Sequence, residues 1–187
     1  MLIRSVDSLE SVQNKVWDEL QYGTMNPAHP FRFAVLSTVN GKQPVSRYVV
    51  FRKLDKDKVM KFYTDSRSAK VEDLKTNPQC SLLFYHPDLQ VQISFQGKTV
   101  IHQNDSLSNR LWQTVPERNR VAYTSVCAPG RKISSPKEAF QWSETDYFCV
   151  VDVFPESLDV LQLNGQEHYR ARFEKGSTDW EGSWITP

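Results

Sequence analysis

The stretch FYTDSRSAK, Phe62 to Lys70, changes from one kind of secondary structure to another within nine residues. Its aromatic and β-branched start is typical of a buried strand. Ser68 is a preferred N-cap residue and predicts a helix that ends before Pro78. A helix start exposes backbone N–H groups without intrahelical partners and carries partial positive charge, so it favours phosphate. This joint is the first candidate site.

Cations gather around the joint. Arg67 precedes the cap and Lys70 lies in the first turn, where a cation is otherwise mildly unfavourable. In the strand VSRYVVFR, Val45 to Arg52, period-2 alternation places Arg47 on the face of Phe51, and buried arginine is rare unless it is paired. If Arg47 faces Ser68 and Lys70, the three would enclose a dianion. A solvated, capped helix start beside an edge strand is the alternative.

Outside this joint the pattern indicates one domain, residues 1–187, with many short strands. An amphipathic helix over residues 8–22 is followed by a hairpin signal at Asn40 and Gly41, and a helix capped by Asn104 or Asp105 precedes a long loop region at 115–145. Strands in hairpin-like succession favour an α+β class, mainly antiparallel β, closed into a barrel. The predicted strands are 31–38, 44–52, 59–64, 79–85, 91–103, 147–154, 157–163, 168–173 and 180–186; only 136–142 within the loop region is expected to be briefly helical.

Composition excludes several classes of function. The net charge is +1, from 23 Lys and Arg against 22 Asp and Glu, so no basic field argues for nucleic acid or a membrane surface. No secretory or membrane-spanning run is evident, and three cysteines without CxxC spacing suit a reducing cytoplasm. The histidines show no metal-ligand spacing, and the scattered glycines form neither a GxGxxG nor a P-loop motif. We expect a cytoplasmic protein with no metal.

Four blocks between Phe33 and Gly97 resemble, in order and spacing, the FMN-binding split barrels related to pyridoxamine 5'-phosphate oxidase. The blocks are AVLSTVNGKQPVSRYVVFR, KFYTDSRSAK, NPQCSLLFY and LQVQISFQG, and the likeness resumes more weakly in the tail. The resemblance implies a split β-barrel with flanking short helices and FMN as cofactor. It also implies a homodimer with FMN at the subunit interface and a small-molecule substrate.

Site residues follow from the same resemblance. Arg47 and Lys70 look like the phosphate-binding pair, Gln92 resembles the glutamine that reaches flavin from the neighbouring subunit, and Arg172 is placed to meet the isoalloxazine. The whole set of implied cofactor-binding residues is Arg47, Val49, Val50, Arg52, Tyr63, Thr64, Arg67, Ser68, Lys70, Gln92 and Arg172. His168 and Arg170 are the implied substrate residues.

Departures from the family pattern concern the substrate more than the cofactor. Arg52 stands where authentic pyridoxamine phosphate oxidases carry Lys, and Val115 stands where they carry an Arg for the substrate phosphate. Arg and Lys differ in geometry although both are cations. A different pocket built from Trp112, Arg118, Arg120 and Trp142 is one hypothesis, and ordinary core packing and solvation of these side chains is the other.

The resemblance implies an FMN-dependent oxidoreductase in which flavin N5 accepts a hydride and oxygen or another acceptor takes the electrons. No catalytic acid or base of the protein is required. An NAD(P)H-dependent flavin or quinone reductase is an alternative within the flavin class. A non-enzymatic flavin or tetrapyrrole binding module is an alternative outside it, and a purely structural barrel is the reading if no flavin binds.

Overall fold

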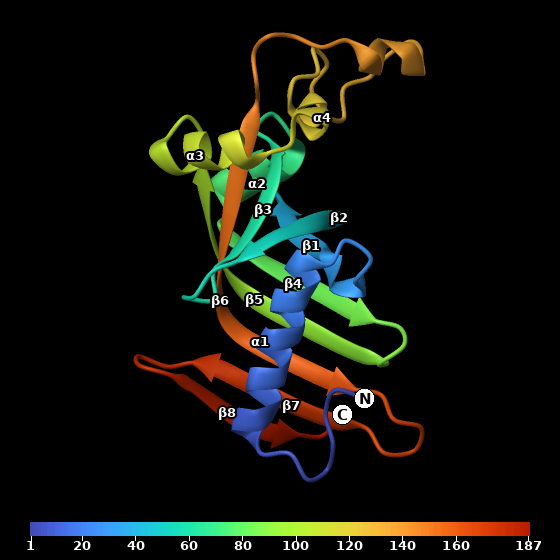
Figure 1. Cartoon of the computed structure of the whole chain (residues 1–187), viewed down its shortest axis with the longest axis vertical. Helices are drawn as coiled ribbons and strands as arrows, with labels where there is room; N and C mark the ends of the chain where they lie inside the picture. The colour runs from blue at the N-terminus through green and yellow to red at the C-terminus, as the bar shows by residue number, and fades with distance from the viewer.

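The structure is a computed structural model that describes every residue from Met1 to Pro187. Its strands succeed one another with few helices between them (Figure 1). The strands are β1 (Phe33–Asn40), β2 (Gln43–Leu54), β3 (Met60–Asp65), β4 (Gln79–His86), β5 (Val91–His102), β6 (Phe148–Gln162), β7 (Tyr169–Lys175) and β8 (Trp180–Ile185). The helices are α1 (Leu9–Met25), α2 (Ala69–Thr76), α3 (Ser106–Thr114) and α4 (Glu117–Arg120), with 3-10 turns η1 (Pro30–Arg32), η2 (Val121–Tyr123) and η3 (Pro136–Phe140).

One antiparallel sheet closes on itself to form the barrel. Its strand order is β3-β2-β1-β4-β5-β6-β7-β8, and β3 also pairs with β6. This pairing closes a ring from β1 to β6 and leaves β7 and β8 as an extension beyond it. The predicted class, a mainly antiparallel barrel with short helices, is confirmed.

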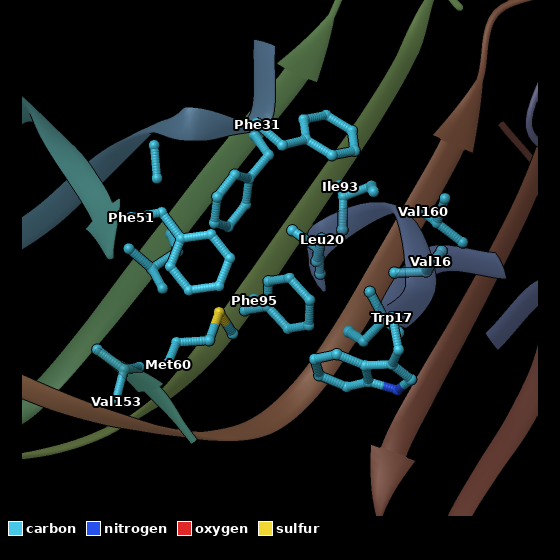
Figure 2. Close-up of a cluster of buried hydrophobic side chains, with 14 of the residues drawn as sticks. Val16, Trp17, Leu20, Phe31, Phe51, Met60, Ile93, Phe95, Val153 and Val160 are labelled. Atoms are coloured by element: carbon cyan, nitrogen blue, oxygen red, sulfur yellow. The ribbon is translucent and has the colours of Figure 1, made fainter. Parts of the chain in front are cut away.

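The barrel interior and α1 share one core. Val16, Trp17 and Leu20 project from α1 toward the sheet (Figure 2) and are almost fully buried. The rings of Trp17 and Phe95 lie 5.3 Å apart. Each large apolar side chain buried in this way contributes about 1.5–3 kcal/mol relative to exposure. The predicted N-terminal helix is confirmed, and Ser8 caps it.

The strand β6 corrects one prediction. Residues 147–154 and 157–163 are not two strands but one, because Pro155 lies at a bulge and not at a break. Across the bulge Gly97 pairs with Pro155 and Gln96 pairs with Ser157, so Glu156 is the extra residue. A side chain at Gly97 would lie 2.2 Å from the Phe154 carbonyl oxygen, which explains the glycine.

The region 115–145 carries more local structure than expected. Besides the predicted turn at η3, it contains α4 and η2, and it rises away from the barrel at one end of the molecule (Figure 1). None of the helices is long and apolar enough to cross a membrane.

Candidate functional site

The end of β3 and the start of α2 bring three polar side chains together. Ser68 is the N-cap of α2, but its side chain makes no capping hydrogen bond. Its hydroxyl instead lies 3.4 Å from the Thr64 hydroxyl, to which the Lys70 ammonium donates at 2.9 Å. Ser68 is buried, whereas Thr64 and Lys70 are half-buried. We call this group, together with Arg47, the cationic joint.

Arg47 reaches the joint from the neighbouring strand β2. It pairs in register with Leu36, whose side chain is in the core, so Arg47 faces the barrel interior as alternation predicted. Its guanidinium donates to the Thr38 hydroxyl at 2.7 Å and lies 3.5 Å from the Asp73 carboxylate. That carboxylate also accepts from Thr38 at 2.7 Å and Asn40 at 2.8 Å. Arg47 is therefore held in place from two sides.

The joint holds more positive than negative charge. Burial lowers the pKa of Lys70, and the nearby Arg47 lowers it further. Lys70 forms no ion pair, and its one hydrogen-bond partner is a neutral hydroxyl. Burial also lowers the pKa of Arg47, although Asp73 opposes this. A half-buried ammonium beside a second cation and a free hydroxyl matches the donor set that binds a phosphate dianion.

Arg67 does not join this group. Its guanidinium forms a double hydrogen bond with Asp65, at 3.0 and 2.7 Å, and donates to the Ser125 carbonyl at 2.7 Å. It also lies 3.3 Å from the centre of the Tyr147 ring. The hydrogen bond with Asp65 raises the pKa of Arg67. These contacts direct Arg67 toward the 115–145 region and away from Lys70.

Tyr63 and Arg52 lie on the other side of β3. Tyr63 packs against Phe148 with ring centres 5.1 Å apart, and burial raises its pKa. The Arg52 guanidinium lies 5.9 Å from the Tyr63 ring, and its Nε is buried without a hydrogen-bond partner. Burial raises the pKa of Tyr123 as well, and Arg52 opposes this. Arg52, which forms no ion pair, thus lies beside the half-buried Tyr63 and the buried Tyr123.

The outer face of the sheet carries the remaining polar residues. Gln92 alternates with the buried Val91 and Ile93, so its side chain points outward. Farther along the same face, Arg170 and Arg172 both donate to the Asp159 carboxylate at 2.9 to 3.2 Å. They line an entirely polar hollow of about 250 Å³.

Three further residues of the predicted site, His168, Val49 and Val50, lie in three different environments. His168 is exposed in the turn before β7, where its Nδ1 accepts from the Asn164 N–H at 3.1 Å. Val49 packs against the core, whereas Val50 alternates to the outer face. On that face an apolar hollow of about 570 Å³ is lined by Pro30, Phe33, Val35, Tyr48, Leu83 and Tyr85.

Residues 14–103 match the family model described as the FMN-binding domain of pyridoxamine 5'-phosphate oxidase. This stretch, a little under half of the chain, is thus similar to the FMN-binding domain of that family. Among its relatives, the pyridoxine/pyridoxamine 5'-phosphate oxidase of Haemophilus influenzae is 25% identical over 158 residues, covering 78% of this chain and 74% of the relative. That of Leptospira interrogans is 27% identical over 164 residues, covering 80% and 75%.

Two solved structures share the fold of this chain over nearly its whole length. A pyridoxamine 5'-phosphate oxidase-related, FMN-binding protein from Nostoc punctiforme has a TM-score of 0.79 at 21% identity, covering 97% of this chain and 100% of that one. PhzG from Burkholderia lata, in complex with tetrahydrophenazine-1-carboxylic acid, has a TM-score of 0.76 at 19% identity, covering 98% and 95%. The cationic joint lies within the residues that match the FMN-binding family model, and its donors fit the FMN phosphate.

Sequence reasoning missed some residues near the cationic joint. Asp73 and Thr38 fix Arg47. The burial of Asp73 indicates such a partner, because aspartate is rarely buried unless paired, but this burial is visible only in the structure. Asp159 alternates outward between Leu158 and Val160, but nothing in its neighbourhood indicated that two arginines would share it.

The four residues proposed for a different pocket do not form one group. Trp112 packs on Phe148 with ring centres 5.2 Å apart, and the Arg120 guanidinium lies 4.9 Å from the Trp112 ring. Arg118 and Trp142 are exposed. Trp112 and Arg120 therefore have a packing role.

A histidine cluster lies outside the cationic joint. One ligand atom each from Glu19, His29 and His86 lies within 4.8 Å of the others. The Nδ1 of His29 accepts from the Phe31 N–H at 3.1 Å, and that of His86 accepts from the Leu89 N–H at 3.2 Å. Each neutral ring therefore carries its proton on Nε2, and His29 donates it to Glu19 at 2.8 Å. Because metal-binding histidine uses its other N–H as a donor, this arrangement does not suit a metal.

Proposed function

We propose that this protein is an FMN-dependent oxidoreductase whose cofactor phosphate binds at the cationic joint. The observation that carries the proposal is Lys70, a half-buried ammonium without a carboxylate partner, beside the fixed guanidinium of Arg47. Without an anion this arrangement costs free energy through desolvation and like-charge repulsion. A phosphate dianion offsets both costs.

Each residue of the joint has a distinct binding role. Arg47 and Lys70 supply charge-assisted hydrogen bonds, and Ser68 offers a hydroxyl that its own helix does not use. The N–H groups of the first turn of α2 add further donors. Bound FMN supplies two-electron redox chemistry at its isoalloxazine ring. The chain itself binds and orients the cofactor, so the proposal needs no catalytic acid or base.

The substrate proposal starts from the relatives. Pyridoxamine or pyridoxine 5'-phosphate is the first substrate to test, because oxidases of these compounds are 25 and 27% identical to this chain over most of its length. Arg52 is the available cation for a second anionic group, since it has no ion-pair partner and its Nε is buried and unsatisfied. Hydride transfer to the flavin and oxygen as the electron acceptor belong to the same proposal.

We further propose that two subunits complete each site. Arg47 faces the barrel interior, whereas Gln92 and Arg172 lie on the outer sheet face. A second copy seated on this face would bring its own Gln92 toward the flavin. The apolar hollow supports this arrangement, because Phe33, Tyr48 and Tyr85 are large aromatic side chains exposed by 49, 77 and 48%.

The decisive experiment begins with the purified protein. Any flavin is released and identified by mass, FMN is added back, and oxidation of pyridoxamine phosphate is assayed beside oxidation of NAD(P)H. Turnover of pyridoxamine phosphate supports the proposal, whereas turnover of NAD(P)H alone favours a flavin or quinone reductase. Flavin retained without turnover of any donor indicates a binding module. A protein that binds no FMN at all refutes the proposal.

The two-subunit arrangement has a separate test. Tyr48→Asp places a charge on the outer face, where a monomer would tolerate it because Tyr48 is mostly exposed. Sedimentation is expected to show a dimer for the wild type and a monomer for the variant. A wild-type chain that sediments as a monomer with FMN bound would remove the dimer from the proposal.

A further inference from the structure

Arg67 is the side chain that ties the Tyr123–Tyr147 segment to the barrel. The segment leaves and returns at one place, because the Tyr147 N–H donates to the Tyr123 carbonyl at 2.7 Å and the Ser66 N–H donates to the Tyr147 carbonyl at 2.8 Å. Arg67 donates to the carbonyls of Ser125 and Val126, at 2.7 and 3.3 Å. No other side chain from outside the segment hydrogen-bonds to residues 124–146.

The turn that contains Arg67 contacts both the cationic joint and the Tyr123–Tyr147 segment. Thr64 and Ser68 face Lys70 on one side. Asp65 points to the opposite side of β3, as alternation requires, and its carboxylate holds Arg67 against Tyr147. The run from Thr64 to Ser68 therefore contributes to both the cationic joint and the attachment of the segment.

Arg67 has almost no donor capacity left for a ligand. Its Nε donates to Asp65, its Nη2 donates to Asp65 and Ser125, and its Nη1 donates to Val126. Four of the five N–H groups of a guanidinium are thus committed. A role in which Arg67 grips phosphate directly would break these contacts and leave the largely buried Asp65 carboxylate unpaired.

We propose that Arg67 is a positioning residue that links FMN binding to the conformation of the Tyr123–Tyr147 segment. The inference rests on the proposed function, because it takes the cationic joint as the FMN phosphate site. Phosphate on Thr64, Ser68 and Lys70 fixes the turn, and the fixed turn holds Arg67 in its contacts with Tyr147 and the two carbonyls. Linkage is reciprocal, so an ordered segment strengthens FMN binding by the same factor by which FMN orders the segment.

The segment also encloses space beside the turn. A hollow of about 260 Å³ lies between Asp65 and the segment, and its lining includes Ser125, Cys127 and Arg131. Its shape depends on the contacts that Arg67 makes. Release of Arg67 would open this hollow without removing any atom of the cationic joint.

Limited trypsin digestion, followed by mass spectrometry, tests the linkage. Arg131 and Lys132 are exposed cleavage points within the segment. We expect saturating FMN to slow cleavage there by at least about fivefold in the wild type, the lower end of typical coupling between sites. In Arg67→Lys, FMN should hardly slow cleavage at all. An ammonium cannot hydrogen-bond to Asp65 and to both carbonyls while also stacking on the Tyr147 ring. The same variant should also bind FMN more weakly than the wild type. The factor by which its affinity falls should equal the factor by which FMN protection of the segment falls.

Control variants distinguish a link between FMN binding and the segment from a general loosening of the segment. Arg110→Lys changes an exposed arginine of α3. It should keep the wild-type ratio of the cleavage rate without FMN to the cleavage rate with FMN. Tyr147→Leu removes only the stacked ring and should lower the ratio partly, so it serves if Arg67→Lys does not fold. A variant that is cleaved faster but is slowed by FMN as strongly as the wild type refutes the inference. So does a wild type that is saturated with FMN, as its absorbance shows, yet is not protected; a wild type that binds no FMN refutes the proposed function instead.

Discussion

Replacing Lys70 with methionine should move cofactor affinity and apoprotein stability in opposite directions. Methionine keeps the apolar length of the side chain and removes the ammonium. Lys70 has one neutral partner, Thr64, and faces the positive charge of Arg47. The charge therefore contributes nothing favourable to the apoprotein, and its removal relieves burial and repulsion.

The expected magnitudes follow from this geometry. Loss of one charge-assisted hydrogen bond to phosphate costs about 1.5–3 kcal/mol, which weakens FMN binding about 10- to 150-fold. The free energy of unfolding of the apoprotein should stay within about 0.5 kcal/mol of the wild-type value or exceed it, as for substitutions that break no structural contact. Arg47→Ala differs, because it leaves the buried Asp73 carboxylate without its cation and should destabilise the fold as well.

Two measurements check the prediction. Titration of FMN, followed by calorimetry or by quenching of flavin fluorescence, gives affinity, and urea unfolding of the apoprotein gives stability. Lys75→Met is the matched control, since Lys75 lies on the same helix, is exposed, and pairs with Glu72 at 2.9 Å. It should leave both quantities near the wild-type values. A Lys70→Met protein that is clearly less stable but binds FMN normally would show that Lys70 is structural.

Three further predictions concern stability. Burial and Arg47 lower the pKa of Lys70 from its ordinary 10.5, so the unfolded chain keeps this proton to higher pH than the folded one; apoprotein stability, measured relative to Lys70→Met across a pH series, should rise as pH climbs through the lowered pKa. Gln162→Leu removes the amide that accepts from Leu2 at 2.8 Å and donates to the turn before β5 at 2.6 Å, so urea unfolding should show a loss of about 2–4 kcal/mol, and an unchanged midpoint would contradict this. Gly97→Ala places a Cβ 2.2 Å from a carbonyl of β6 and should cost about 1–3 kcal/mol by thermal unfolding, more than alanine at Gly41, which has open space and only its positive φ to oppose it.

The fold was predictable where local chemistry and hydrophobic period agree. Asn40 and Gly41 predicted the β1–β2 hairpin, and Gly41 adopts the positive φ that such a turn needs. The prediction was wrong in β6, where Pro155 indicates a break on sequence grounds alone. A proline is tolerated there because the bulge opposite Gly97 removes the need for its N–H, and that fact depends on a residue 58 positions earlier in the chain.

The cationic joint was predictable only in part, for a similar reason. Ser68 and Lys70 lie within one short stretch, and alternation placed Arg47 on the inner face of β2. The direction of Arg67 was not predictable, because it depends on Asp65 and on the segment that returns at Tyr147, 80 residues later. Two cations only three residues apart can thus point to opposite sides of the same turn.

This separation of Arg67 from Lys70 gives the turn two functions that mutation can distinguish. Changes at Lys70 act on the anion directly and should leave the Tyr123–Tyr147 segment attached in the apoprotein. Changes at Arg67 leave every phosphate donor in place and should act on FMN only through the segment. Combining Lys70→Met with Arg67→Lys therefore tests the coupling. If Lys70 acts on the phosphate and Arg67 acts only through the segment, the segment of the double variant should show no protection by FMN. The double variant's loss of FMN binding free energy should then equal the sum of the losses in the two single variants. A sum that falls well short would mean that the two side chains already share a single phosphate contact.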